Sequence, residues 1–198
     1  PTKDEIRLLI TKAPARHKPL IMTALFTGMR MSELRGLCWD AIDFDRSIIK
    51  VRKRADRYCQ MGSPKSKSGR RDIPMGPQLA TILKEWKLAC PVGDLNLVFP
   101  NGIGNVETHS NICNRVFNPL MIECGIVDEE GAPRFALHAM RHAAASLFIE
   151  QGWPPKKIQT MLGHSSITMT YDVYGHLFHD PAKDVDLMGA MEQGLLAA

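Results

Sequence analysis

The stretch HAMRHAAASLFIE, residues 138–150, predicts the central helix of the domain. Its apolar residues recur on one helical face, at Leu137, Met140, Ala144 and Leu147. Gly152 follows at a position where helices commonly end. A helix with one apolar face needs other elements to cover that face. We therefore expect a helical core, with His138 and Arg141 on the flank of this helix.

Further helices are predicted on both sides of this stretch. Thr2 and Glu5 fit a capping box, and Gly28 ends a dense apolar run. The expected helices and amphipathic segments cover residues 2–12, 17–26, 32–37, 77–88, 109–124, 154–163, 167–177 and 185–195. A mainly helical domain follows from this count of segments.

Two short segments predict a small antiparallel sheet. Ser47–Val51 is rich in β-branched residues and follows the turn-like residues 43–45. Residues 62–69 then predict a turn before a partner strand around Arg71–Pro74, and residues 97–100 predict a further extended piece. We therefore expect an α+β fold, mainly α-helical with a small antiparallel sheet.

The composition indicates one compact domain inside the cell. The chain has 198 residues, of which 44% are hydrophobic, enough for one sizeable core. No apolar run approaches the roughly 20 residues of a membrane span, and residues 1–5 do not resemble a signal peptide. The five cysteines are widely spaced and include no Cys-x-x-Cys pair. We therefore expect neither a membrane protein nor a disulfide framework.

Positive charge is concentrated in the predicted sheet. Residues 46–71 contain ten Lys or Arg and one acid, so that segment carries +9 within a chain of net +4. Such a block suits a phosphate backbone, although a solvated hairpin without a partner would look the same. The residues that we expect to contact DNA are Arg52, Lys53, Arg54, Lys67, Arg70 and Arg71.

Three short segments hold the residues that could carry chemistry. In TGMRMSEL, residues 27–34, Arg30 and Glu33 stand one helical turn apart. In HAMRH, residues 138–142, His138 and Arg141 have the same spacing and could address one anion. In LGHSSITMTYDVYGH, residues 162–176, a histidine in a glycine-containing turn precedes a helix that bears tyrosines. Taken singly, each segment could be an ion pair, a surface patch or ordinary packing.

Taken in this order, the three segments resemble the tyrosine recombinases of the phage integrase type. The matching pattern is Thr-Gly-x-Arg-x-x-Glu-Leu, then His-x-x-Arg, then Leu-Gly-His before Tyr-x-His, and it extends from Arg30 to His176. The basic residues 64–71 look like the β-hairpin of that family. The resemblance implies the family's catalytic-domain fold and a site-specific recombinase that cuts and rejoins DNA through a covalent 3′-phosphotyrosine.

The resemblance also implies a role for each site residue. Arg30 and Arg141 would hold the phosphate, as guanidinium groups keep their charge and fit phosphate oxygens. His138 and His164 would complete the ring of donors, and His138 is the expected proton acceptor. Tyr174 would be the nucleophile.

The nucleophile and the general acid each have an alternative residue, and Glu33 has a supporting role. Tyr171 lies one turn before Tyr174 and could face the same way. The resemblance implies a lysine of the hairpin as general acid, which we assign to Lys65 with Lys67 as the competitor. Glu33 would orient the arginines. No metal, nucleotide or other cofactor is needed in this scheme, because the arginines and the lysine supply the positive charge.

The family pattern implies a domain division and partners. We expect residues 1–178 to form the catalytic domain and 179–198 a C-terminal tail or helix that relatives exchange between protomers. An N-terminal core-binding domain is expected to be missing from this chain. The expected partner is DNA at recombination sites, with a homo-tetramer for the full-length protein, accessory DNA-bending proteins and no membrane. The expected location is the cytoplasm, in association with the nucleoid of a bacterial host.

Three rival functions share some of these residues. A type IB topoisomerase-like enzyme would use the same nucleophile and arginines, but the wording around residues 162–178 favours integrases. A non-catalytic DNA-binding protein would need the basic block alone and would leave the other segments unexplained. A zinc enzyme could use His138 and His142, which have the spacing of a helical metal pair, but Ala139 stands where a glutamate is needed.

Overall fold

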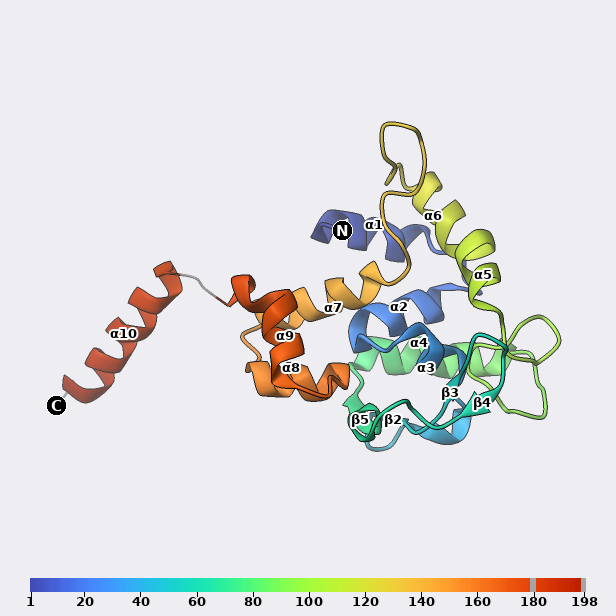
Figure 1. Ribbon diagram of the computed structural model, residues 1–198, viewed down its shortest axis with the longest axis horizontal. Helices are drawn as coiled ribbons and strands as arrows, with labels where there is room; N and C mark the ends of the chain where they lie inside the picture. Colours follow the sequence, from blue (N-terminus) through green and yellow to red (C-terminus); the bar gives the residue numbers. More distant parts are fainter. Residues whose placement is uncertain (179–180, 197–198) are drawn as a thin grey trace.

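Helix α7 (Ala139–Glu150) is the central helix of the computed structural model, which describes residues 1–178 and 181–196 (Figure 1). It packs against α2 (Lys18–Thr27), which is buried along most of its length. Gly28 ends α2 in the left-handed conformation, with φ of 60°. Both helices were predicted from their apolar residues, and together they form the core on which the remaining elements pack.

Helices α1 (Lys3–Lys12) and α4 (Pro77–Ala89) both pack on α2, and in Figure 1 α1 lies above it and α4 below it. The predicted capping box is present, since the Thr2 side chain accepts from the backbone N–H of Glu5 and the Glu5 carboxylate accepts from that of Thr2. The short α3 (Met31–Arg35) follows α2 and places Glu33 in the interior.

The segment predicted as one amphipathic stretch at 109–124 is divided in the structure. Helix α5 (His109–Ile112) leads into a π-helical turn (Cys113–Phe117) and then into α6 (Asn118–Glu123). Pro119 has no backbone N–H to donate to the preceding turn, and its ring crowds that turn, which explains the widened geometry.

The predicted antiparallel sheet is confirmed and gains a third strand. Its order is β1 (Ile42–Asp43), β2 (Ile48–Val51) and β5 (Arg71–Pro74), with Ile49 opposite Ile73. Two further strands, β3 (Arg54–Ala55) and β4 (Met61–Gly62), pair beyond β2 and were not predicted. The mainly helical α+β fold therefore agrees with the sequence prediction.

The C-terminal helices bring the last motif against the sheet and α7. Helix α8 (Pro155–Leu162) contacts both α7 and β5, and α9 (Ile167–Tyr174) packs on α8 before a 3-10 turn (Gly175–Leu177). Figure 1 shows α8 and α9 beside the end of α7. Residues far apart in the sequence thus meet at the C-terminal end of α8.

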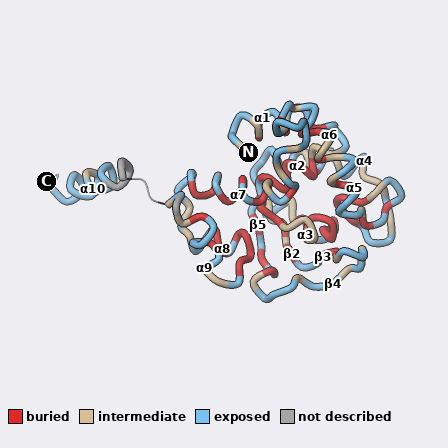
Figure 2. Tube along the Cα trace, turned by 45° about the horizontal axis from the view of Figure 1, so that its top comes forward, coloured by how far each residue is buried: buried red, intermediate tan, exposed pale blue. Residues whose placement is uncertain are grey.

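Helix α10 (Pro181–Leu196) contains the helix predicted at 185–195 and extends away from the rest of the domain (Figures 1 and 2). Val185, Leu187 and Leu195 expose 61–78% of their surface. Its exchange between protomers stays a prediction, and residues 179–180 and 197–198 of the predicted tail lie outside the described residues. Among the helices of the described residues, none combines the length and apolarity needed to cross a membrane.

Candidate active site

A buried ion pair between Glu33 and Arg71 lies beneath the site. Both side chains are 2% exposed, and Arg71 Nη1 and Nη2 lie 3.1 and 2.9 Å from the two oxygens of Glu33. Burial opposes ionisation of the carboxyl, but hydrogen bonds and charge from Arg71 hold the pKa of Glu33 below its ordinary value. Glu33 is therefore a carboxylate that joins α3 to the sheet.

The position of Arg71 differs from the predicted DNA contact. Its Nε donates to the carbonyl of Met161 at 2.6 Å, and Nη1 donates to that of Gly69 at 3.0 Å. With these bonds and Glu33, the guanidinium is committed to the protein interior, so we correct Arg71 from a DNA contact to a supporting residue. The other predicted contacts reach the surface, namely Arg52, Lys53, Lys67 and Arg70, which are exposed, and Arg54, which is half-buried.

Arg30 occupies the first position of the site, at the start of α3. Its backbone N–H donates to Glu33 Oε2 at 2.9 Å, and its Nη1 lies 3.0 Å from Glu33 Oε1. Nη2 donates to the carbonyl of Gly163 at 2.9 Å. Because its side chain remains 34% exposed, Arg30 can still present N–H groups to a ligand.

Arg141 lies deeper, on α7, and joins the ends of two helices. Nη1 donates to the carbonyl of Gly28 at 2.6 Å and Nη2 to that of Leu162 at 2.7 Å. Burial, with a smaller effect from the nearby charge of Arg30, lowers the pKa of Arg141 to about 9, so its guanidinium is still charged at neutral pH.

Three arginines share the end of α8, and this arrangement gathers the positive charge of the site. The last carbonyls of a helix have no partner within the helix. Here the carbonyls of residues 159 and 160 accept from the backbone N–H groups of His164 and Gly163. Those of residues 161, 162 and 163 each accept from one arginine, namely Arg71, Arg141 and Arg30 in that order. The negative end of the helix dipole therefore faces three cations.

Gly163 is the residue that makes this arrangement possible. Its φ is 67°, and a Cβ atom there would lie 2.9 Å from both Arg71 Nη1 and the carbonyl oxygen of Ser68. The first is a buried guanidinium and the second is backbone, so neither can move freely. The turn that carries residues 63–70 therefore packs directly against the glycine that precedes His164.

Gly163→Ala should lower the free energy of unfolding by roughly 3 kcal/mol, from the left-handed backbone and from displacement of Arg71. Gly125→Ala is a matched control, because Gly125 has the same φ of 67° and a Cβ atom there would meet nothing within 4 Å. For that variant we expect the free energy of unfolding to fall by about 1 kcal/mol, from backbone strain alone. Urea unfolding measures both. Equal losses would show that the contacts with Arg71 and Ser68 do not constrain residue 163.

His164 follows Gly163 and is held by a buried hydroxyl. Its Nδ1 lies 2.9 Å from Oγ1 of Thr170, which is fully buried, and His164 itself is 8% exposed. Burial first, and then the charges of Arg141 and Arg30, lower the pKa of His164 to about 4. The imidazole is therefore neutral at physiological pH.

The low pKa of His164 predicts a loss of stability in acid. Its ordinary pKa is about 6.5, so between pH 6.5 and 4 the unfolded chain binds more protons than the folded one, and stability falls as pH falls. His164→Gln removes this difference. From pH 7.5 to pH 5 the original protein should lose about 2 kcal/mol more than His164→Gln in urea unfolding. Parallel losses in the two proteins would contradict the assigned environment.

Tyr174 meets a histidine that was not among the predicted site residues. It is 4% exposed, and its hydroxyl oxygen lies 2.7 Å from Nδ1 of His142. His142 stands edge-on to His138, with ring centroids 5.0 Å apart. The expected proton acceptor, His138, is exposed beside this pair. The spacing of His138 and His142 on one helical face was the available signal, and it was interpreted only as a zinc pair.

Tyr171 and the two candidate lysines lie outside this cluster. Tyr171 is 48% exposed and its ring is near that of Phe178, with centroids 5.7 Å apart. Lys65 and Lys67 are exposed in the turn between β4 and β5, whose Ser68 carbonyl lies beside Gly163. The turn thus comes near the arginines, and the choice between the two lysines stays a prediction.

The zinc alternative finds no ligand set among the residues that the structure describes. Among the described residues, no three His, Cys, Asp or Glu side chains are grouped as a metal ion requires. His138 and His142 thus have no third ligand in that part of the chain, and His142 already contacts the hydroxyl of Tyr174.

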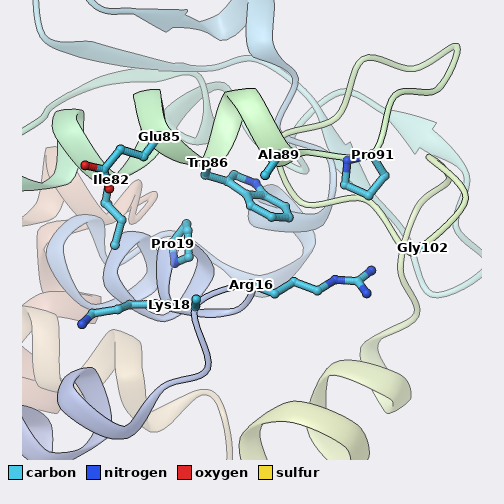
Figure 3. Close-up of a pocket in the computed structure, with 10 residues that line it drawn as sticks. Arg16, Lys18, Pro19, Ile82, Glu85, Trp86, Ala89, Pro91 and Gly102 are labelled. Carbon is cyan, nitrogen blue, oxygen red and sulfur yellow. The ribbon is translucent and has the colours of Figure 1, made fainter.

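A separate hollow of about 640 Å³ lies between the start of α2 and α4 (Figure 3). Trp86, Pro19 and Pro91 contribute apolar walls, with Arg16 and Lys18 at its edge. None of the predicted site residues lines it. The candidate chemistry is therefore on the surface formed by α3, α7, α8 and α9 and is distinct from this hollow.

Comparison with known proteins identifies the family and the fold of the chain. The model described as the phage integrase family matches residues 2–180. A tyrosine recombinase XerC-like protein of Caldanaerobacter subterraneus subsp. tengcongensis is 31% identical over 186 residues, covering 82% of this chain and 46% of the relative. The Tn1549 transposon integrase, solved with circular intermediate DNA, matches with a TM-score of 0.79 and 27% identity, covering 96% of this chain and 66% of that one. The catalytic domain of bacteriophage HP1 integrase shares the fold, with a TM-score of 0.59, 18% identity, and 92% and 90% coverage. The chain spans about half the length of the curated relatives that it matches.

Proposed function

Because the chain belongs to the phage integrase family, we propose that it is the catalytic domain of a site-specific DNA recombinase that cuts and rejoins DNA through a covalent 3′-phosphotyrosine. The observation that carries the proposal is the meeting of Arg30, Arg141, His164 and Tyr174 around the end of α8 and the adjoining end of α7. These residues come from three separate segments of the chain, 27–34, 138–142 and 162–176. Neither a solvated basic surface nor ordinary core packing requires that combination.

The arginines supply fixed charge for a phosphodiester that becomes more negative during attack. Each guanidinium carries five N–H groups and uses only some of them on helix carbonyls, which leaves others for phosphate oxygens. The neutral imidazole of His164 can donate one further hydrogen bond, and the exposed His138 can add another. Glu33 and Arg71 position Arg30 from below.

The reaction that we propose has two matched halves. The hydroxyl oxygen of Tyr174 attacks phosphorus, and the bond from phosphorus to the 5′-oxygen breaks. Lys65, with Lys67 as the competitor, gives that oxygen its proton. A free 5′-hydroxyl then attacks the phosphotyrosine and joins a new strand. The energy of the ester bond is kept in the intermediate, so no nucleotide is required, and the arginines and lysine act where other enzymes use a metal ion.

The proposed substrate is DNA, held in part by the exposed basic residues Arg52, Lys53, Arg54, Lys67 and Arg70. We further propose that the whole protein assembles as a homo-tetramer on DNA. The support for assembly is α10, whose apolar side chains are exposed and away from its own domain, as an exchanged helix requires.

A nicked suicide duplex carrying the attachment site tests the proposal. The whole protein is incubated with the duplex in EDTA and without ATP, and the products are separated under denaturing conditions. We expect a covalent adduct that mass spectrometry maps to Tyr174, and none from Arg141→Ala. An absence of adduct with DNA that the protein demonstrably binds would favour the non-catalytic DNA-binding alternative. An adduct that forms only with added zinc would favour the metal-dependent one.

A further inference from the structure

The contact between His142 and Tyr174 has no role in the reaction proposed so far. The two side chains come from α7 and α9. The hydroxyl oxygen of Tyr174, which would attack phosphorus, lies 2.7 Å from Nδ1 of His142. Tyr174 is almost fully buried while His142 is exposed, so the contact joins the buried hydroxyl to a side chain that reaches the protein surface. In the neutral tautomer that carries its hydrogen on Nε2, Nδ1 of His142 can accept the hydrogen bond from the tyrosyl hydroxyl.

His142 has the state that a proton acceptor needs. Burial, followed by the charge of Arg141, lowers its pKa, which favours the neutral imidazole. Among the described side chains, the other titratable groups around it are His138 on the same helix, Tyr174 on α9 and His164 in the turn before α9. All three are uncharged in their ordinary states at neutral pH, so Arg141 is the charge that acts on this imidazole.

We propose that His142 is the general base for Tyr174 in strand cleavage and its general acid in rejoining, a role that rests on the proposed recombinase function. In cleavage the bond from Tyr174 Oη to phosphorus forms, the hydroxyl proton passes to Nδ1 of His142, and the bond from phosphorus to the 5′-oxygen breaks. In rejoining the 5′-hydroxyl attacks, the bond to Oη breaks, and Nδ1 returns the proton. Lys65, with Lys67 as the competitor, gives the leaving 5′-oxygen its proton in cleavage and takes the proton of the attacking 5′-hydroxyl in rejoining, so both halves balance.

This role reassigns the proton transfer that the sequence placed at His138. His138 touches the ring of His142 edge-on and does not contact the tyrosyl hydroxyl in the described structure. It remains available to donate a hydrogen bond to a phosphate oxygen. The two histidines of HAMRH would then act on different atoms of the same reaction.

The first test is the pH dependence of adduct formation in a single turnover with the whole protein. His142→Asn keeps a side chain that can hydrogen-bond but cannot accept a proton. At pH 7 it should slow adduct formation roughly 100-fold or more. The acidic limb of the original protein's profile should disappear, and the rate of the variant should rise with pH up to the range where tyrosine ionises. Ser146→Ala, one turn further along α7 on the exposed surface, should match the original protein.

The second test lowers the pKa of the nucleophile itself. Difluorotyrosine at position 174 ionises at a lower pH than tyrosine and needs less help from a base. It should raise the rate of His142→Asn at pH 7 at least about tenfold, while the protein with His142 intact should change much less. A histidine that only positions the ring would give no such rescue.

The outcomes separate this inference from the function on which it rests. If the original protein forms no adduct, the recombinase function fails. If it forms an adduct and His142→Asn keeps both its rate and its pH profile, the recombinase function stands and His142 is not the base. Rescue by difluorotyrosine of His138→Gln in place of His142→Asn would return the role to His138.

Discussion

Tyr174→Phe should abolish the covalent adduct with a nicked duplex, reducing its rate of formation by at least about a thousandfold. The variant keeps the buried aromatic ring and loses the only atom that can bond to phosphorus. The cost to folding should be about 1 kcal/mol, because one hydrogen bond to a partly exposed histidine is lost. A folded, DNA-binding and inactive protein is the expected result, measured by denaturing gel and by circular dichroism.

Tyr171→Phe is the matched control for this loss. It removes the same hydroxyl one turn earlier on α9, from a ring that is 48% exposed and directed at Phe178. Adduct formation should stay within about twofold of the original, as expected for a surface substitution away from the site. Loss of the adduct in Tyr171→Phe, with retention in Tyr174→Phe, would transfer the nucleophile to Tyr171 and show that α9 turns before cleavage.

Arg71→Met should lower the free energy of unfolding by about 3 kcal/mol, because it leaves Glu33 buried without its bidentate partner. Methionine fills much of the same space, so loss of packing contributes little. Arg30 still contacts Glu33, which keeps the cost at the lower end for a broken buried pair. For a chain of this size the melting temperature should fall by roughly 10 °C.

Arg52→Met supplies the comparison, at the residue that follows the neighbouring strand β2. Arg52 pairs with Asp72 where both side chains are nearly half exposed, and such pairs are worth at most about 1 kcal/mol. Arg52→Met should instead reduce the salt dependence of DNA binding by about one unit of slope. If Arg71→Met left stability unchanged and reduced that slope, Arg71 would be the DNA contact that its place in the basic block first suggested.

Arg71 shows what a charge pattern cannot reveal by itself. The ten basic residues of 46–71 were treated as one surface, yet Arg71 lies on the same face of β5 as the buried Ile73, two residues later. Because side chains alternate between the two faces of a strand, the spacing from Ile73 already indicated that Arg71 faces the core. The local sequence could not show that Glu33 is the partner of Arg71, because the two residues are 38 positions apart and meet only in the tertiary fold.

The helices and the three motif segments were accessible to sequence reasoning because their signals are local. Apolar residues located α2 and α7, Pro154 and Pro155 indicated the start of α8, and Gly28 and Gly163 marked the ends of α2 and α8. Strands β3 and β4 were missed because two residues each are too few to show alternation. His142 was missed for another reason: the hydroxyl that it contacts is 32 residues distant, and nothing in HAMRH indicates which histidine α9 will approach.

The end of α8 has a consequence for how this protein tolerates change. Arg30, Arg71 and Arg141 donate to main-chain carbonyl oxygens at the end of this helix. Every amino acid supplies such an oxygen at the same position of the backbone. The exposed Lys156, Lys157 and Thr160 could therefore be replaced by other amino acids without disturbing these hydrogen bonds. Inserting or deleting one residue within α8 would rotate its end by about 100° and carry those oxygens out of reach. In an alignment or a redesign, the length of this helix should be preserved more strictly than its composition.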